Sequence, residues 1–148
     1  VYIASVVEAA IALVKDECEK KAIEITVNVD PHLIILGNPS QLEMVVLNLT
    51  NNAIDSLSTY EGKRTIAFSA TQIGSKILLA IEDSGAGVPL ELDDKIFELF
   101  RTTKNEGMGF GLWLSRAVMD NHRGSLTLDK DYSDGARFVI EFRTDECL

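Results

Sequence analysis

The sequence predicts a single domain of the α/β class, on three observations. Three segments repeat apolar residues every three or four positions, five shorter segments alternate apolar with polar residues, and one long segment shows no period. The chain has 148 residues, of which 46% are hydrophobic and 25% charged, the size and balance of one soluble globular domain. We therefore expect residues 1–148 to form one folded unit.

The first elements follow from two kinds of periodicity. Residues 1–22 carry apolar side chains at helical spacing, which predicts an amphipathic helix. Residues 23–29 then alternate Ile and Val with polar side chains, which predicts a strand with one wet face, ended by Asp30 and Pro31.

The middle of the chain reads as a long helix followed by a hairpin. Pro39, directly after Gly37 and Asn38, suits the first turn of a helix, which we expect to run to about Leu57. Residues 66–70 and 76–83 have strand patterns and are joined by a turn at Gly74 and Ser75.

The last third contains an irregular segment, a helix and a second hairpin. Residues 84–106 show no period, and a connection of that length inside a compact domain indicates a functional loop. Residues 112–121 follow as a helix with Gly124 as its stop signal. Residues 125–128 and 136–142 form the closing hairpin.

The charge and cysteine content exclude several classes of function. The formal net charge is −9, whereas nucleic acids and anionic membranes bind clustered Lys and Arg, so we expect neither as a partner. The apolar runs are far shorter than the roughly 20 residues that span a bilayer. The two cysteines, Cys18 and Cys147, have no zinc-type spacing. We therefore expect this chain to be cytoplasmic. A longer protein that contains it can itself be membrane-anchored.

A polar stripe on the long helix is the first candidate site. At 100° per residue, Asn48, Asn52 and Asp55 project within roughly 60° of one another, beside the apolar face. Asn is a middling helix former, so its repeated use here suggests a task, although a solvated face is the alternative. Asn48 can offer a carbonyl oxygen to a hydrated Mg²⁺, and Asn52 can hold phosphate or metal-bound water.

The second candidate is the end of the strand at 76–83. Asp83 continues the apolar face of that strand, so its carboxylate needs a partner. One interpretation is a cap on the following turn; the other is an acceptor for the amine of adenine, with Gly85 and Gly87 letting the backbone approach the base.

The third candidate is the glycine-rich approach to the last helix. Gly107, Gly109 and Gly111 offer free backbone N–H groups and a positive helix terminus to a polyphosphate, with a flexible hinge as the alternative. The preceding loop holds the apolar anchors Phe97, Leu99 and Phe100.

The same loop carries the local positive charge that an anionic ligand requires in an acidic chain. Lys104 can reach a terminal phosphate, and Thr102 and Thr103 can donate hydrogen bonds to it; a solvated basic tip is the alternative. Of the two imidazoles, His32 is expected to be exposed, and His122 is expected to cap a helix as a cation.

Four ordered segments, 48–55, 82–87, 97–104 and 107–112, resemble the N, G1, F and G2 boxes of the histidine kinase ATP-binding domain, within the gyrase, Hsp90, histidine kinase and MutL superfamily. The Phe-Arg-Thr-Thr-Lys segment is most similar to that of nitrogen-regulation sensor kinases. Val1 and the helical start indicate a piece of a longer protein.

The resemblance implies a sandwich in which about three helices cover one face of a mixed, mostly antiparallel five-stranded sheet, the Bergerat fold, with 84–106 as a lid over ATP and Mg²⁺. It implies catalytic roles for Asn48 and Lys104, with Asn48 as the metal ligand. The implied nucleotide-binding residues are Asn48, Asn52, Asp55, Asp83, Gly85, Gly87, Thr102, Thr103, Lys104, Gly107, Gly109, Gly111 and Leu112.

The implied function is phosphoryl transfer from ATP to a His on a separate dimerisation and phosphoacceptor hairpin, and from there to the receiver domain of a response regulator. Asp55 stands where several relatives carry Lys or His, which argues against a cationic phosphate contact there. The alternatives are a gyrase-type or MutL-type ATP-driven clamp, an anti-sigma-type serine kinase, and a nucleotide-binding module without transfer activity.

Overall fold

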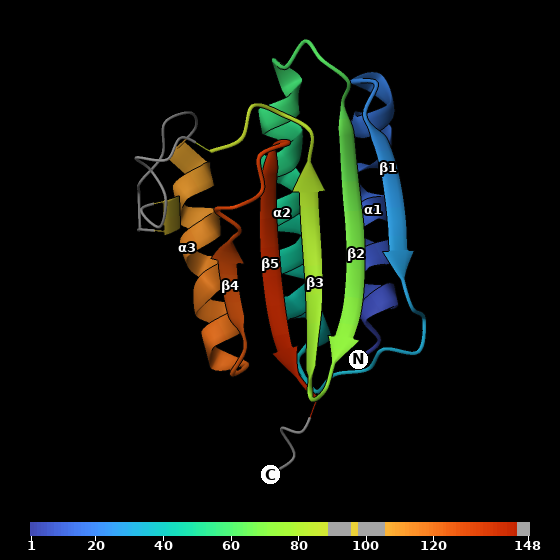
Figure 1. Cartoon of the computed structure of the whole chain (residues 1–148), viewed down its shortest axis with the longest axis vertical. Coiled ribbons are helices and arrows are strands. Elements are labelled where there is room, and N and C mark those ends of the chain that lie inside the picture. Colours follow the sequence, from blue (N-terminus) through green and yellow to red (C-terminus); the bar gives the residue numbers. More distant parts are fainter. Residues whose placement is uncertain (89–95, 98–105, 145–148) are drawn as a thin grey trace.

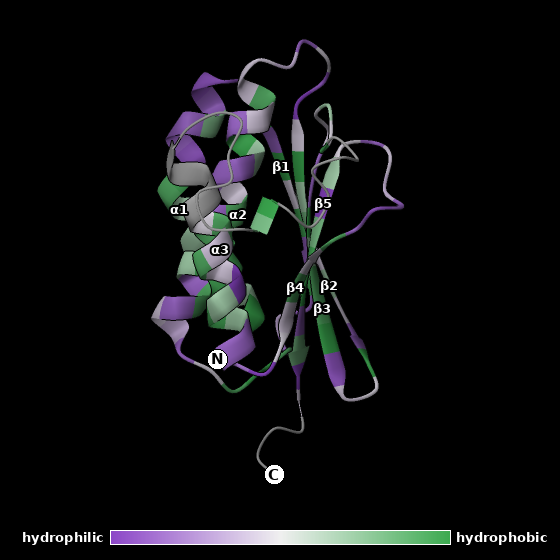
Figure 2. Ribbon diagram, turned by 90° about the vertical axis from the view of Figure 1, so that its left-hand side faces the viewer, coloured by the Kyte–Doolittle hydropathy of each residue, from purple (hydrophilic) through white to green (hydrophobic). Residues whose placement is uncertain are grey.

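The computed structural model of the chain describes residues 1–88, 96–97 and 106–144, with the side chains of 106–110 excepted. The elements follow the order α1 (Ile3–Lys20), β1 (Glu24–Val29), α2 (Pro39–Ser58), β2 (Thr65–Ile73), β3 (Lys76–Asp83), α3 (Glu106–Asn121), β4 (Ser125–Leu128) and β5 (Ala136–Arg143). Three helices lie against one face of the sheet, so the molecule has two layers (Figures 1 and 2). The expected mixed five-stranded sandwich is confirmed.

The sheet has the strand order β1-β2-β3-β5-β4. The β1–β2 pair is parallel and the other three pairs are antiparallel. A parallel pair needs a long crossover, and α2 supplies it between β1 and β2. The N-terminus and the end of β5 lie at the same end of the molecule (Figure 1).

The core lies between the helices and the inner face of the sheet. In register across the central strands, Phe68 faces Ile81 and Ile81 faces Phe138, and all three side chains are buried. The same inner face ends in Asp83, which pairs with Ile66 and Ala136 at the edge of the core. Strand alternation thus delivers one carboxylate to the layer between the sheet and the helices, as the sequence predicted.

Strand β1 is less covered than its pattern predicts. Ile23 is buried just before the strand, but Val27 on the predicted inner face is 50% exposed. The reason is its place in the sheet, because β1 is an edge strand and α1 packs mainly against α2. Helix α1 also begins at Ile3 rather than Val1, since Val1 accepts a backbone hydrogen bond from Ile35.

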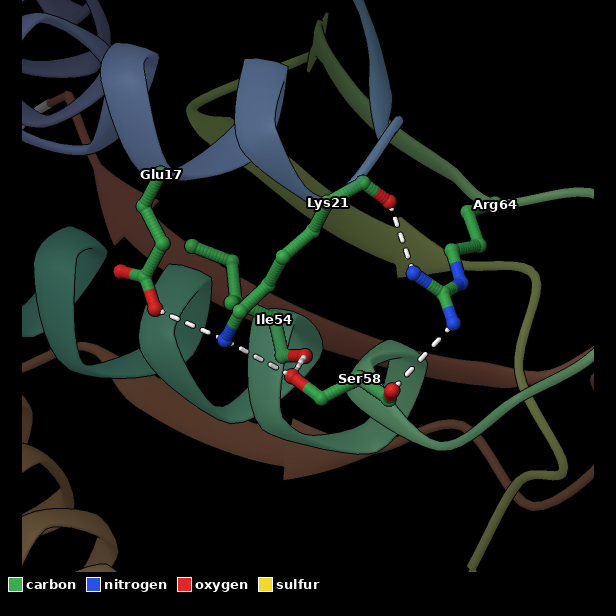
Figure 3. Close-up of polar contacts among 5 residues, drawn as sticks. All are labelled: Glu17, Lys21, Ile54, Ser58 and Arg64. Atoms are coloured by element: carbon green, nitrogen blue, oxygen red, sulfur yellow. Dashed lines mark hydrogen bonds and ion pairs between the residues drawn. The ribbon is translucent and has the colours of Figure 1, made fainter.

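Arg64 joins the C-terminal ends of α1 and α2 (Figure 3). Its guanidinium donates to the carbonyl oxygens of Lys21 at 2.7 Å, Tyr60 at 3.0 Å and Ser58 at 3.2 Å. Lys21 Nζ in turn donates to Glu17 Oε2 and Ser58 Oγ, each at 2.9 Å. One cation therefore satisfies terminal carbonyls of two helices and opposes both macrodipoles.

Among the described residues, no helix is both long and apolar enough to cross a membrane.

Candidate functional site

Helix α2 positions the first group of predicted residues. It begins where expected because Asn38 caps it, its side chain accepting from Gln41 N–H at 3.0 Å, and Pro39 fills the first turn. Asn48, Asn52 and Asp55 are half-buried along one side of the helix. The polar stripe is thus a boundary between core and solvent rather than a fully solvated face.

Asn48 makes side-chain contacts to α3. Its Nδ2 donates to Ser115 Oγ at 3.1 Å and lies 3.4 Å from the carbonyl oxygen of Gly111. Ser115 is fully buried, and it is the one buried polar side chain among the described residues of α3. This pair brings the predicted metal ligand and the glycine-rich segment together.

Asp83 is 5% exposed and accepts backbone hydrogen bonds. Its Oδ1 lies 2.9 Å from the nitrogen of Gly85 and 3.4 Å from that of Ala136. The carboxylate therefore caps the turn that follows β3, as one of the two interpretations predicted. Its contact with adenine stays a prediction.

The loop after β3 approaches both α2 and the β4–β5 connection closely. A Cβ on Gly85 would lie 2.8 Å from Ser56 Oγ on α2, and Gly87 has a φ of +84°. Gly135 has a φ of +148°, and a side chain on it would collide with the carbonyl of Asp83. These close approaches hold the Gly85–Gly87 loop between α2 and the β4–β5 connection.

Several carboxylates gather at this end of the sheet, and one of them, Glu82, is paired with Arg137 at 2.9 Å. Burial, followed by the negative charges of Glu82, Asp134 and Asp83, raises the pKa of Tyr132, which lies beside the loop. A carboxylate-rich environment suits an exocyclic amine and disfavours phosphate. Any phosphates of a bound nucleotide are therefore expected away from Asp83, toward α3.

The glycine-rich segment lies inside a helix rather than before it. Helix α3 begins at Glu106, so Gly107, Gly109 and Gly111 occupy its first turns. The sequence predicted a start near Leu112 because each Gly costs a helix about 1 kcal/mol relative to Ala. A Cβ on Gly111 would meet Asn48 Cγ at 3.7 Å, an ordinary contact, so packing against the described residues does not require glycine there.

Phe97 is confirmed as an apolar anchor, since it is 4% exposed. Its ring meets Phe138 edge-on with centroids 6.1 Å apart, and the guanidinium of Arg116 on α3 lies 4.5 Å from its centroid. Leu112, named as a nucleotide contact, is also buried at 4%. Leu99, Phe100, Thr102, Thr103 and Lys104 lie outside the described residues.

His122 caps the C-terminal end of α3, as expected. Its Nδ1 lies 2.9 Å from the carbonyl of Val118, and its Nε2 lies 3.1 Å from the backbone nitrogen of Asn38. A carbonyl only accepts and a backbone N–H only donates, so Nδ1 carries the proton and Nε2 is bare. The ring therefore connects the end of α3 to the start of α2. His32 is 91% exposed, as expected.

The donor set fits a metal that keeps most of its waters. Among the described residues, no three His, Cys, Asp or Glu side chains gather as a metal site. One amide oxygen at Asn48, joined by phosphate and water, matches the way Mg²⁺ is held at nucleotide sites. It does not match a closed structural zinc or calcium centre.

Sequence reasoning placed Gly135 in a hairpin turn but missed its close approach to Asp83, and it also missed Ser115 and the pairing of His122 with Asn38. A signal existed for Ser115, which falls on the same helical face as the buried Leu112 and Met119. The pairing of His122 with Asn38 joins positions 84 residues apart, so it had no local signal.

Comparison with known proteins decides the family. The model of the histidine kinase-, DNA gyrase B-, and HSP90-like ATPases matches residues 37–146, most of the chain and all three described segments of the site. The chain belongs to this ATPase family. The resemblance read from the four sequence boxes is confirmed.

Relatives and solved structures of this ATPase family extend the match. Sporulation kinase B of Bacillus subtilis is 27% identical over 84% of the chain and 29% of its own length. The catalytic domain of histidine kinase ThkA has a TM-score of 0.85 and 23% identity, covering 97% of this chain and 95% of that one. The fold is thus that of a histidine kinase catalytic domain, and the chain spans less than a third of the curated relative.

Two further structures contain ligands or partners. Full-length ShkA, in complex with AMPPNP, has a TM-score of 0.83 and 26% identity over 97% of this chain and 31% of its own. Histidine kinase ThkA in complex with the response regulator TrrA has a TM-score of 0.80 and 22% identity over 97% of this chain and 41% of its own.

Proposed function

We propose that this ATPase-family domain is the catalytic domain of a sensor histidine kinase. It binds ATP with Mg²⁺ and presents the terminal phosphate to a His on a separate dimerisation hairpin, which passes it to a response regulator. Two observations carry the proposal: Asn48 on α2 contacts Gly111 in the first turns of α3, and Asp83 is buried at the end of β3, where it caps the turn at Gly85. We infer that this domain carries out the transfer in the cytoplasm.

Each end of the site suits one end of the nucleotide. The negative Asp83 end is assigned to the base, with Gly85 and Gly87 against its plane. The phosphates are assigned to the start of α3, where Gly107 and Gly109 offer N–H groups at a positive helix terminus. Gly111 supports this, because a residue costly to the helix stands where packing among described residues does not require it.

The remaining predicted residues complete the assignment. Asn48 is the protein ligand of Mg²⁺, which when bound would neutralise charge on the phosphates. Asn52 is assigned to phosphate or metal-bound water, and Asp55 lies on the same edge of α2 as part of the nucleotide-binding surface. Lys104 with Thr102 and Thr103 is assigned to the terminal phosphate.

Binding and transfer are tested separately. Isothermal titration of the chain with ATP, with and without Mg²⁺, measures binding, and radiolabelled ATP with a cognate phosphoacceptor hairpin measures transfer. We expect Mg²⁺-dependent binding, transfer to the hairpin, and no phosphate on His32 or His122. Binding without transfer would identify a nucleotide-binding module instead, and rapid ATP hydrolysis by the chain alone would favour a clamp-type ATPase.

Two substitutions test the assignment of the two ends. Asp83→Asn should lower the affinity for adenine nucleotides by about 10-fold. The amide oxygen can still cap the turn, but the carboxylate charge is lost. Gly109→Val should prevent ATP binding by obstructing the N–H groups of α3. Urea unfolding of each variant separates loss of binding from loss of fold, and wild-type affinity in both would refute this site.

A further inference from the structure

Ser115 is a buried hydroxyl whose described partner is a residue of the proposed site. It lies on α3 between the buried Leu112 and Met119 and is 0% exposed. Burying a hydroxyl in an apolar layer is costly unless it is hydrogen-bonded. Its oxygen lies 3.1 Å from Asn48 Nδ2, a good N–H···O distance.

The surroundings of Asn48 fix which way its amide points. The second atom near Nδ2 is the carbonyl oxygen of Gly111, at 3.4 Å, which can only accept. The NH₂ group must therefore be the half of the amide that meets these two acceptors on α3, and Oδ1 is the half that meets neither. The bond to Ser115 is the shorter of the two and is the main restraint, because hydrogen bonds weaken toward 3.5 Å.

We propose that Ser115 is a positioning residue for the metal ligand: its Oγ holds the NH₂ of Asn48 so that Oδ1 is presented to the Mg²⁺ of a bound nucleotide. This rests on the proposed function for the role of Asn48, but the restraint itself is a property of the chain without ligand. Partners that orient a metal ligand are commonly worth 10-fold or more in metal affinity. Because Ser115 lies on α3, the position of α3 sets the orientation of a ligand on α2.

The geometry also explains why the ligand position carries Asn rather than Asp. A carboxylate would bind a hard cation more strongly, but one of its oxygens would then face the Gly111 carbonyl with no donor between them. An amide satisfies the carbonyl on one side and keeps an oxygen for the other side.

The test uses the whole chain and two substitutions that each remove a buried hydroxyl. Ser115→Ala removes the contact with Asn48. Thr50→Val is the matched control, since Thr50 is also 0% exposed and donates to the carbonyl of Val46 on α2 instead. ATP affinity is measured over a Mg²⁺ titration and again in EDTA.

We expect Ser115→Ala to raise the Mg²⁺ concentration for half-maximal ATP binding by about 10-fold, with metal-free ATP affinity changed less than about 2-fold. Thr50→Val should move neither value. A variant in which both affinities fall together would indicate a merely structural role and overturn the inference. Should wild type show no Mg²⁺-dependent ATP binding, the proposed function fails, whereas a Ser115→Ala variant with wild-type Mg²⁺ dependence refutes only the positioning role.

A second readout needs no nucleotide. In ¹⁵N–¹H spectra, the side-chain NH₂ signals of Asn48, assigned by their loss in Asn48→Asp, should shift and exchange faster with water in Ser115→Ala. Ser115→Cys keeps a similar volume with a weaker acceptor and should fall between the two in both readouts, which covers the case in which Ser115→Ala folds poorly. Unchanged NH₂ signals in both variants would contradict the restraint.

Discussion

The two helix pairs of this domain are held together in different ways. Helices α1 and α2 pack through apolar side chains such as Val7 and Leu57, each 0% exposed, and their polar links, from Arg64 and from Lys21 to Ser58, lie only at their C-terminal ends. Helices α2 and α3 also bury apolar residues, but their cross-contacts include the hydrogen bonds from Asn48 to Ser115 and from Asn38 to His122.

The difference follows the division between scaffold and site. Apolar burial is non-directional and tolerates small shifts, whereas a side-chain hydrogen bond requires a particular distance and angle. The α1–α2 pair can therefore serve as a scaffold, while the α2–α3 pair sets the orientation of groups that would contact a nucleotide. Variants at each pair should separate stability from ligand binding.

Arg64→Ala should give the largest effect, on stability alone. It leaves terminal carbonyls of both helices without their charged donor, and we expect the free energy of unfolding to fall by about 2–3 kcal/mol. Arg64→Lys keeps the charge but not the three-pronged geometry and should recover only part of the loss. Urea unfolding gives the stability, and a change in Mg²⁺ dependence of ATP binding would contradict the division between the pairs.

Asn48→Asp should have the next largest effect. It should change both the stability and the Mg²⁺ dependence of ATP binding. A carboxylate oxygen facing the Gly111 carbonyl should cost about 1–2 kcal/mol of unfolding free energy and alter the Mg²⁺ titration of ATP binding. Asn52→Asp makes the same chemical change one turn later on α2 and should cost less than about 0.5 kcal/mol. Equal losses of stability at the two positions would show that the Gly111 contact is unimportant.

His122→Ala tests the other cross-contact of α2 and α3. It removes the acceptor for Asn38 N–H and the donor to Val118, so we expect a loss of about 1 kcal/mol. His32→Ala, at an exposed ring, should lie within about 0.5 kcal/mol of wild type. Thermal unfolding of both variants at neutral pH compares their stabilities. Equal stability of the two would show that the His122–Asn38 contact does not stabilise the fold.

The smallest expected effect on stability is at Asp129, away from both helix pairs. The hydrogen bond from Arg137, at 2.7 Å, and that from Asp131 N–H lower the pKa of Asp129. A lowered pKa in the folded state means that this carboxylate stabilises the fold above its unfolded pKa and loses that contribution as the pH falls below about 4. Asp129→Asn should cost less than about 1 kcal/mol at pH 7, and the deficit should shrink toward pH 3 in urea unfolding. A deficit independent of pH would contradict this assignment.

Periodicity in the sequence predicted most of the fold. Residues 76–83 form β3 with the expected bounds, and α2 ends within a residue of Leu57. In both elements the apolar residues of the pattern are the ones that pack in the core. The placement of Asp83 on the inner face of β3 followed from alternation alone. The family itself followed from four ordered boxes.

Other features depend on distant contacts and had no local signal. The start of α3 at Glu106 opposes the helix propensity of its glycines, and the exposure of Val27 reflects the edge position of β1. The contact of His122 with Asn38 joins positions far apart in the sequence. Polar partners of this kind are fixed by tertiary geometry, which propensity does not encode.

The bond between His122 and Asn38 lies at one end of α3, so a tilt of that helix with this bond kept would turn about this end. At 1.5 Å per residue, Ser115 lies about 10 Å along the axis from that end and Gly107 about 22 Å. A tilt of roughly 5° about the same end would then move Gly107 by about 2 Å and Ser115 by about 1 Å, enough to break a hydrogen bond. Helix α3 would in that case act as a lever, in which a small rotation at the glycine end releases the Asn48 amide.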